Sequence, residues 1–304
     1  MICGHGSRDD DATREFAAMV ERLRVRLPWP VEHGYLEFAR PIIRDGLEKL
    51  ARRGARRILA QPAMLFAAGH VKNDLPWELN TWAAETPGVD VEYGRDLAID
   101  LKLLAAARAR IEEAEAGAGA VDRADAALLV VGRGTNDPDA NSNVAKVMRM
   151  LWEGMGFGWG AVAYSGVAHP RVDAALSRVV RLGFRRVIVF PYFLFTGVLV
   201  KRIYEQAAAV AASVPAVEIV KAGYLNDHPL VLDAMVERVG EMLTGDNVMN
   251  CRLCKYRAQI IGYEGDVGTP QAGHHLHVRG AGTNKDHGHG HGHPDHGHDH
   301  PRDR

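Results

Sequence analysis

Residues 35–41, Tyr35-Leu36-Glu37-Phe38-Ala39-Arg40-Pro41, line up with residues 164–170, Tyr164-Ser165-Gly166-Val167-Ala168-His169-Pro170, at a shift of 129 positions. Three further pairs of segments keep this shift or one of 128: 53–58 with 182–187, 62–72 with 191–201, and 4–9 with 132–137. Self-similarity that persists in register along the chain indicates a structural unit that occurs twice. The sequence therefore predicts two similar lobes.

Each copy alternates strand-like apolar runs with helical periodicity. Residues 10–27 place an apolar stripe on one helical face, with Ser7, Asp9 and Asp10 available for capping at its start. Strands are predicted at 31–36, 57–60, 89–93 and 126–131, and further helices from about Leu97 and about Ala140. Strands that alternate with helices indicate an α/β fold, here two lobes that each contain a mostly parallel sheet flanked by helices. A ligand cleft is expected between the lobes, at the carboxyl ends of the strands.

The composition changes along the chain suggest five segments. We expect a first lobe at residues 1–115, a short Ala/Gly/Glu-rich linker at 116–125 and a second lobe at 126–245. A cysteine-containing extension at 246–273 and a disordered His-rich tail at 274–304 are expected to follow.

The charge balance argues against two classes of partner. The 304 residues contain 37 Lys and Arg against 38 Asp and Glu, so no broad positive charge favours a nucleic acid or a membrane surface. The longest apolar run, 187–200, is too short to span a bilayer and contains Pro191 and Gly197. The start of the sequence has no basic segment followed by an apolar one, which predicts a cytoplasmic location.

Two loop histidines are the strongest candidates for chemistry. His5 lies between two glycines directly after a strand end, and His70 follows small residues after a second strand. A neutral imidazole both binds borderline metal ions and accepts protons near pH 7. The second copy has Arg133 and Leu199 at the matching positions, so we predict one asymmetric metal site in the first lobe. The alternative, that each histidine is an ordinary loop residue with satisfied hydrogen bonds, stays open at this point.

Charged residues near these loops extend the candidate site. Glu37 follows the predicted strand 31–36 and is matched by Gly166, so its carboxylate either assists metal delivery and proton uptake or is a solvated strand-end charge. Cations flanking the same loops can pair with the carboxylates of an anionic ligand or remain surface charges: Arg8, Arg40, Arg44, Lys72 and Arg133.

Three motifs resemble the sirohydrochlorin cobaltochelatase family. They are residues 4–9 (Gly-His-Gly-Ser-Arg-Asp), 35–41 and 66–74 (Phe-Ala-Ala-Gly-His-Val-Lys-Asn-Asp), and with the second lobe the resemblance covers about residues 1–245. It implies a class II chelatase fold that binds sirohydrochlorin between its lobes. It also implies that His5 is the metal-binding proton acceptor, His70 the second metal ligand and Glu37 their acidic neighbour.

The resemblance implies contacts and a reaction as well. The segment Leu65, Phe66, Ala67, Ala68 and Gly69 is expected to contact the tetrapyrrole, and Arg8 and Arg40 to bind its carboxylates. The implied reaction is the insertion of Co²⁺, as substrate, into sirohydrochlorin in cobalamin biosynthesis. Fe²⁺ or Ni²⁺ insertion and a non-enzymatic metallochaperone or metal reservoir are the alternatives. Family members have several more apolar residues before the Gly-His-Gly motif, so either the first strand is short here or the sequence starts downstream of the natural one.

The C-terminal part carries two further metal-binding features. Met249, Cys251 and Cys254 form a Met-X-Cys-X-X-Cys element, which the resemblance associates with an iron–sulfur cluster in long family members. Two thiolates do not complete a four-ligand site, so histidines or a second subunit, in a homodimer, would supply the rest. The alternative, judged from the residues alone, is two ordinary reduced cysteines. The low-complexity tail is expected to bind divalent ions weakly through His287, His289, His291, His293, His296, His298 and His300.

Anaerobic purification is expected to give a brown protein that contains iron and acid-labile sulfide, because thiolates in this spacing can ligate one metal centre. Changing both Cys251 and Cys254 to serine should remove the colour and the iron. A colourless, iron-free wild-type preparation would contradict the cluster.

Overall fold

The computed structural model describes residues 1–249, 254, 257, 261–262, 264–268 and 280. Within them the chain forms two four-stranded sheets in which every pairing is parallel. The first has the order β2-β1-β3-β4, with β1 (Ile2–Gly4), β2 (His33–Tyr35), β3 (Arg57–Pro62) and β4 (Asp90–Tyr93). The second has the order β6-β5-β7-β8, with β5 (Ala126–Gly132), β6 (Trp159–Tyr164), β7 (Arg186–Pro191) and β8 (Glu218–Lys221). The predicted fold class, two similar α/β lobes, is confirmed.

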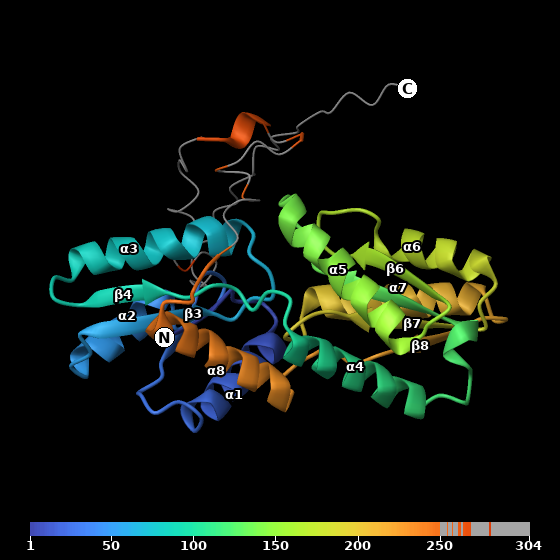
Figure 1. Cartoon of the computed structure of the whole chain (residues 1–304), viewed down its shortest axis with the longest axis horizontal. Coiled ribbons are helices and arrows are strands. Elements are labelled where there is room, and N and C mark those ends of the chain that lie inside the picture. The colour runs from blue at the N-terminus through green and yellow to red at the C-terminus, as the bar shows by residue number, and fades with distance from the viewer. Residues whose placement is uncertain (250–253, 255–256, 258–260, 263, 269–279, 281–304) are drawn as a thin grey trace.

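The helices cover both faces of each sheet, as all-parallel strands require. The central strands β5 and β7 are buried along their whole length, which explains the apolar runs 126–131 and 187–190 within them. Figure 1 shows the two sheets side by side with the helices layered around them. The helices are α1 (Asp10–Arg24), α2 (Ile43–Arg52), α3 (Leu75–Glu85), α4 (Leu101–Ala116), α5 (Pro138–Met155), α6 (Val172–Val179), α7 (Val198–Ser213) and α8 (Pro229–Thr244).

The repeated segments 35–41 and 164–170 form the same loop in both lobes. Tyr35 lies opposite Gly4 in the first sheet, and Tyr164 lies opposite Gly132 in the second. Each tyrosine donates its backbone N–H to the proline that ends its segment, at 2.8 and 2.9 Å. Each also donates its hydroxyl to a backbone carbonyl of the helix that follows the first strand of its lobe, α1 or α5. The repeat therefore corresponds to equivalent hydrogen bonds.

Several predicted boundaries move because of capping. α4 starts at Leu101 instead of about Leu97, because Asp100 caps it and the N–H groups of Leu97 and Ala98 bind the carbonyls of the 64–65 loop. α5 starts at Pro138 because Asp137 accepts from the N–H of Asp139. α1 ends at Arg24, and α4 continues through Ala116, the first residue of the predicted linker.

The last helix of each repeat packs on the opposite lobe. α4 follows β4 in sequence but contacts α5 and β8 of the second lobe, whereas α8 follows β8 but contacts β3 and α1 of the first. Figure 1 shows α8 beside α1 under the first sheet and α4 under the second. The buried guanidinium of Arg238 holds α8 in this position on the first lobe, because it donates to the carbonyl of Leu97 and pairs with Asp100. The packing of α4 and α8 on opposite lobes is called the helix exchange below.

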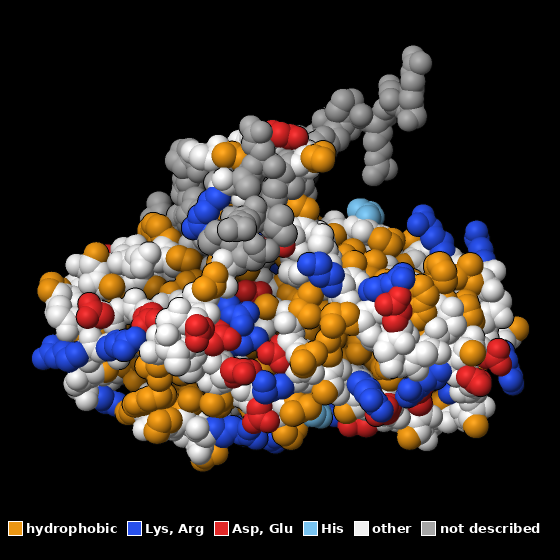
Figure 2. All heavy atoms as spheres, viewed as in Figure 1, with side chains coloured by type: hydrophobic (Ala, Val, Ile, Leu, Met, Phe, Trp, Pro, Cys, Tyr) orange, Lys and Arg blue, Asp and Glu red, His pale blue; other side chains and the backbone are white. Residues whose placement is uncertain are grey.

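One apolar core runs through both lobes. It includes Ile2 and Phe16 from the first half and Leu128 and Phe190 from the second, while separate clusters lie on the outer face of each sheet. The surface in Figure 2 has positive and negative side chains interspersed, in keeping with the formal net charge of −1. None of the helices in the described part of the chain combines the length and apolar character that crossing a bilayer requires.

Two lysines at matching repeat positions bridge the lobes. The Lys72 Nζ lies 2.7 Å from Asp137 Oδ2 and 3.2 Å from Asp139 Oδ2, with the Lys72 and Asp137 side chains 1% exposed. Burial alone would lower the pKa of Lys72, but hydrogen bonds and attraction to these carboxylates raise it, so the amine is charged. Lys201 makes the equivalent bridge to Asp9 and Asp11, but 48% of its side chain is exposed.

Lys72→Met is expected to lower the free energy of unfolding by about 3–5 kcal/mol, because it leaves Asp137 buried without a counter-charge. The matched control is Lys201→Met, which should move the urea midpoint far less because the side chains of Lys201 and Asp11 are each 48% exposed and Asp9 still accepts the N–H of Asp11. A second variant, Lys72→Met with Asp137→Asn, should recover part of the loss. Equal losses for the two lysine variants would contradict this account.

Candidate metal and tetrapyrrole site

Close backbone contacts hold His5 and Glu37 together. Gly6 has a φ of +96°, and a Cβ at this position would lie 1.7 Å from the carbonyl oxygen of Glu37. The backbone N–H of Glu37 donates to the carbonyl of His5 at 3.0 Å. The loop after β1 and the loop after β2 are therefore packed together at the carboxyl end of the first sheet, and glycine at position 6 is required for this approach.

His70 comes from a π-helical turn, η1 (His70–Asp74), that leads into α3. Its Nδ1 lies 2.6 Å from Asp74 Oδ2. Because the carboxylate accepts, Nδ1 carries the proton and the lone pair is on Nε2. This Nε2 lies 4.0 Å from Glu37 Oε1. Asp74 thus orients the ring in the way that carboxylates orient metal-binding histidines.

His5 is held in the same tautomer. Its Nδ1 lies 2.9 Å from the carbonyl oxygen of Gly6 and therefore donates to it. Its Nε2 accepts from Arg133 Nη2 at 3.2 Å and lies 3.3 Å from Glu37 Oε1. The rings of His5 and His70 meet edge to face, with their centroids 4.6 Å apart.

The structure thus brings together three of the predicted site residues. Ligand atoms of His5, Glu37 and His70 all lie within 4.8 Å of one another. Metal–ligand bonds of about 2.0–2.2 Å allow a single ion to bridge such donors after small side-chain shifts. Two imidazoles and a carboxylate suit borderline divalent ions such as Co²⁺, Fe²⁺ and Ni²⁺.

The surroundings of His5 keep its ring neutral. Burial lowers the pKa of His5 well below 6.5, and the charge of Arg133 lowers it further. Solvent moderates the effect, because 28% of the side chain is exposed. At neutral pH the ring therefore keeps its lone pair for a metal ion.

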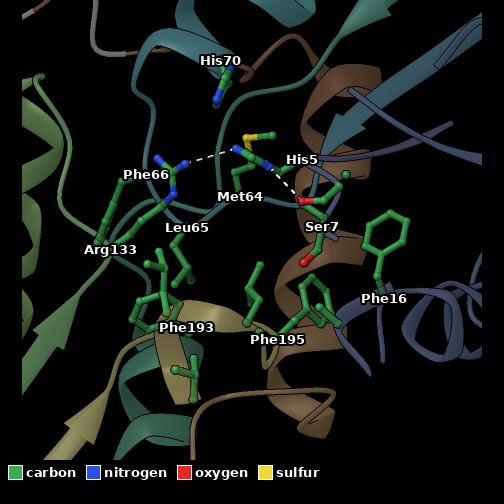
Figure 3. A pocket seen from close by; sticks show the side chains of 18 of the residues that line it. His5, Ser7, Phe16, Met64, Leu65, Phe66, His70, Arg133, Phe193 and Phe195 are labelled. Atoms are coloured by element: carbon green, nitrogen blue, oxygen red, sulfur yellow. Dashed lines mark hydrogen bonds between the residues drawn. The ribbon is translucent and has the colours of Figure 1, made fainter. Parts of the chain in front are cut away.

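Two of the three donors, His5 and His70, line one end of a cavity of about 450 Å³ between the lobes, and Glu37 lies beside them. Figure 3 shows His5, His70 and Arg133 around this end, with Phe193 and Phe195 of the second lobe at the other. The lining is mainly apolar and includes residues of both 64–68 and 193–197, which are matching segments of the repeat. Its size is typical of small-ligand sites, and its aromatic lining suits a flat conjugated ring.

The predicted contact residues divide into two groups. Arg8, Leu65, Phe66 and Ala68 line the cavity, and the Arg8 guanidinium stacks over Phe38 at 4.7 Å. The other three are not lining residues: Arg40 is exposed, Gly69 is partly exposed, and Ala67 is buried with its N–H donated to Asp96.

Two of the flanking cations serve the protein itself. Arg44 pairs with Glu78 and Glu85, and Lys72 forms the buried bridge described above, so both cations already have carboxylate partners within the protein. Asp74 was missed as a site residue, although its spacing of four from His70 places both side chains on one side of a helical turn. That spacing was the available signal.

Much of the predicted C-terminal metal site lies outside the described residues, namely Cys251 and the seven tail histidines 287, 289, 291, 293, 296, 298 and 300. Cys254 is described and is 2% exposed.

Asp74→Asn is expected to weaken Co²⁺ binding at the site about 10- to 100-fold, because the His70 ring loses its carboxylate partner. Calorimetric titration measures Co²⁺ binding, and the part assigned to this site is the binding that is lost in a His70→Ala variant. Asp90→Asn removes the same charge from an exposed position on β4 and should leave this component unchanged. An unchanged affinity in Asp74→Asn would show that Asp74 does not orient the ligand.

The chain is similar to known proteins along most of its length. The CbiX family model matches residues 1–114 and 127–242. Among curated proteins, the sirohydrochlorin cobaltochelatase of Priestia megaterium is 34% identical over 266 residues, 86% of this chain and 85% of the relative. A sirohydrochlorin ferrochelatase of the same organism is 30% identical over 80% of this chain and 89% of the relative. The solved structure of SirB from Bacillus subtilis with Fe³⁺ superposes with a TM-score of 0.69 at 28% identity, covering 81% of this chain and 95% of SirB. The chain therefore belongs to the CbiX family, the family of the sirohydrochlorin chelatases.

Proposed function

We propose that this protein inserts Co²⁺ into sirohydrochlorin and acts in cobalamin biosynthesis in the cytoplasm. The observation that carries the proposal is the group His5, Glu37 and His70, of which His5 and His70 line an apolar cavity between the lobes. An apolar cavity takes the faces of a macrocycle, and the three donors present an ion to its centre.

Metal insertion replaces pyrrole N–H protons by the ion, so the site must supply both ligands and a proton acceptor. His5 and His70 each offer only the Nε2 lone pair, because each Nδ1 donates to the protein. An imidazole that holds the ion through this atom has no second lone pair for a proton. Glu37, 3.3 Å from His5 Nε2, is therefore the better proton acceptor.

The choice of Co²⁺ rests on the cobaltochelatase relative at 34% identity. Insertion of Fe²⁺ is the second candidate, because the next relative is a ferrochelatase and this donor set accepts both ions. In either case the metal is a substrate and leaves in the product.

His5→Ala and His70→Ala are expected to bind sirohydrochlorin but to lose metallation, because the ion is no longer held at the ring. The measurement is the anaerobic change in the absorption spectrum of sirohydrochlorin with Co²⁺, Fe²⁺ or Ni²⁺, and Co²⁺ should give the highest kcat/KM. His169→Ala, which removes an exposed imidazole away from the cavity, is the control. Full activity in both site variants would refute the mechanism, and a preference for Fe²⁺ would replace the cobalt assignment.

A further inference from the structure

Arg133 takes the place of His5 in the second copy of the repeat. The segments Gly4-His5-Gly6 and Gly132-Arg133-Gly134 begin at the last residue of the inner strands β1 and β5, and the last glycine of each has a positive φ, +96° and +78°. The two lobes thus place these side chains on opposite walls of one cavity. Figure 3 shows the Arg133 guanidinium reaching across to the His5 ring.

The contact between them uses the atom that a metal ion needs. Arg133 Nη2 donates to His5 Nε2 at 3.2 Å, and the other ring nitrogen donates to Gly6. A neutral imidazole has one ring nitrogen with an available lone pair. The hydrogen bond from Arg133 and a metal bond of about 2.0–2.1 Å therefore exclude each other at His5. The positive guanidinium also repels a dication at this position.

A carboxylate is a better partner for Arg133 than the imidazole is. Guanidinium and carboxylate groups form paired, charge-assisted hydrogen bonds, which are about twice as strong as neutral ones. The ligand of the proposed function, sirohydrochlorin, carries carboxylates around its ring. Arg133 lines the same cavity as His5 and His70, so a carboxylate of a ligand bound there can reach its guanidinium.

We propose that Arg133 is a positioning residue that blocks the His5 lone pair in the free protein and is withdrawn by a carboxylate of the bound tetrapyrrole. The inference rests on the proposed function and adds an order to it: tetrapyrrole first, metal second. The two substrates then bind with positive coupling, because the tetrapyrrole removes the competitor of the ion. When no tetrapyrrole is bound, the site therefore holds an ion only weakly.

The test measures two affinities in the full chain, that of Co²⁺ alone and that of metal-free sirohydrochlorin alone. Arg133→Gln and Arg133→Met should bind Co²⁺ at the site about tenfold more tightly and sirohydrochlorin about tenfold more weakly, as expected for the loss of one charge-assisted hydrogen bond. Opposite changes distinguish this role from a structural one, since a damaged site would bind both more weakly. Arg8→Gln removes a cation that lines the same cavity but stacks on Phe38, and it should not tighten Co²⁺ binding.

A double-mutant cycle isolates the contact from ions bound elsewhere on the chain. In a His5→Ala background, Arg133→Gln should no longer affect Co²⁺ affinity, because the blocked lone pair is absent. Unchanged or weaker Co²⁺ binding in both Arg133 variants would overturn the proposal, as would unchanged sirohydrochlorin binding. Failure of the wild type to bind sirohydrochlorin would refute the proposed function instead, and the Co²⁺ titrations would still report on Arg133.

Discussion

The site depends on the orientation of two imidazole rings, each fixed by a hydrogen bond from its Nδ1. The acceptors are of different kinds, a backbone carbonyl at Gly6 and the carboxylate of Asp74. Both bonds have the same effect, because they leave Nε2 unprotonated and directed at the space beside Glu37. In the proposed function, rings that are already fixed lose little rotational freedom when they bind an ion, which favours specific binding. The backbone contact between the His5 and Glu37 loops and the turn at η1 serve this arrangement.

The chemistry arises from differences between two copies of one framework. Matching strands, loops and tyrosine hydrogen bonds give the cavity two similar walls. On one wall are His5, Glu37 and His70, and the matching positions on the other hold Arg133, Gly166 and Leu199. In the proposed function an ion is therefore held from one side only, and the mainly apolar second wall, with Arg133 on it, is left for the tetrapyrrole. The duplication provides the two walls of the cavity, and the differences between the copies decide which wall carries the metal-binding side chains.

The parallel sheets were predictable from the sequence because strand and loop positions follow from local patterns of apolar runs and turn residues. The same patterns, compared between the two copies of the repeat, marked out His5, Glu37 and His70, whose ligand atoms lie within 4.8 Å of one another in the structure. The helix exchange was not predictable in this way, because the apolar face of a helix is the same whichever sheet it covers. The contact between Arg133 and His5 depends on how the two lobes face each other, which no segment encodes alone. Asp74 could have been found from its helical spacing, but the π-turn that places it is a tertiary feature.

The exchanged helices make the two halves of the chain mutually dependent. Without α8 the first sheet would expose apolar surface next to β3, and without α4 the second lobe would do so next to β8 and α5. Neither half is a self-sufficient folding unit, so the molecule should gain or lose its structure as a whole. A protein built from a single such half would need a second copy of itself to supply the missing helix, and would then enclose a cavity with two identical walls.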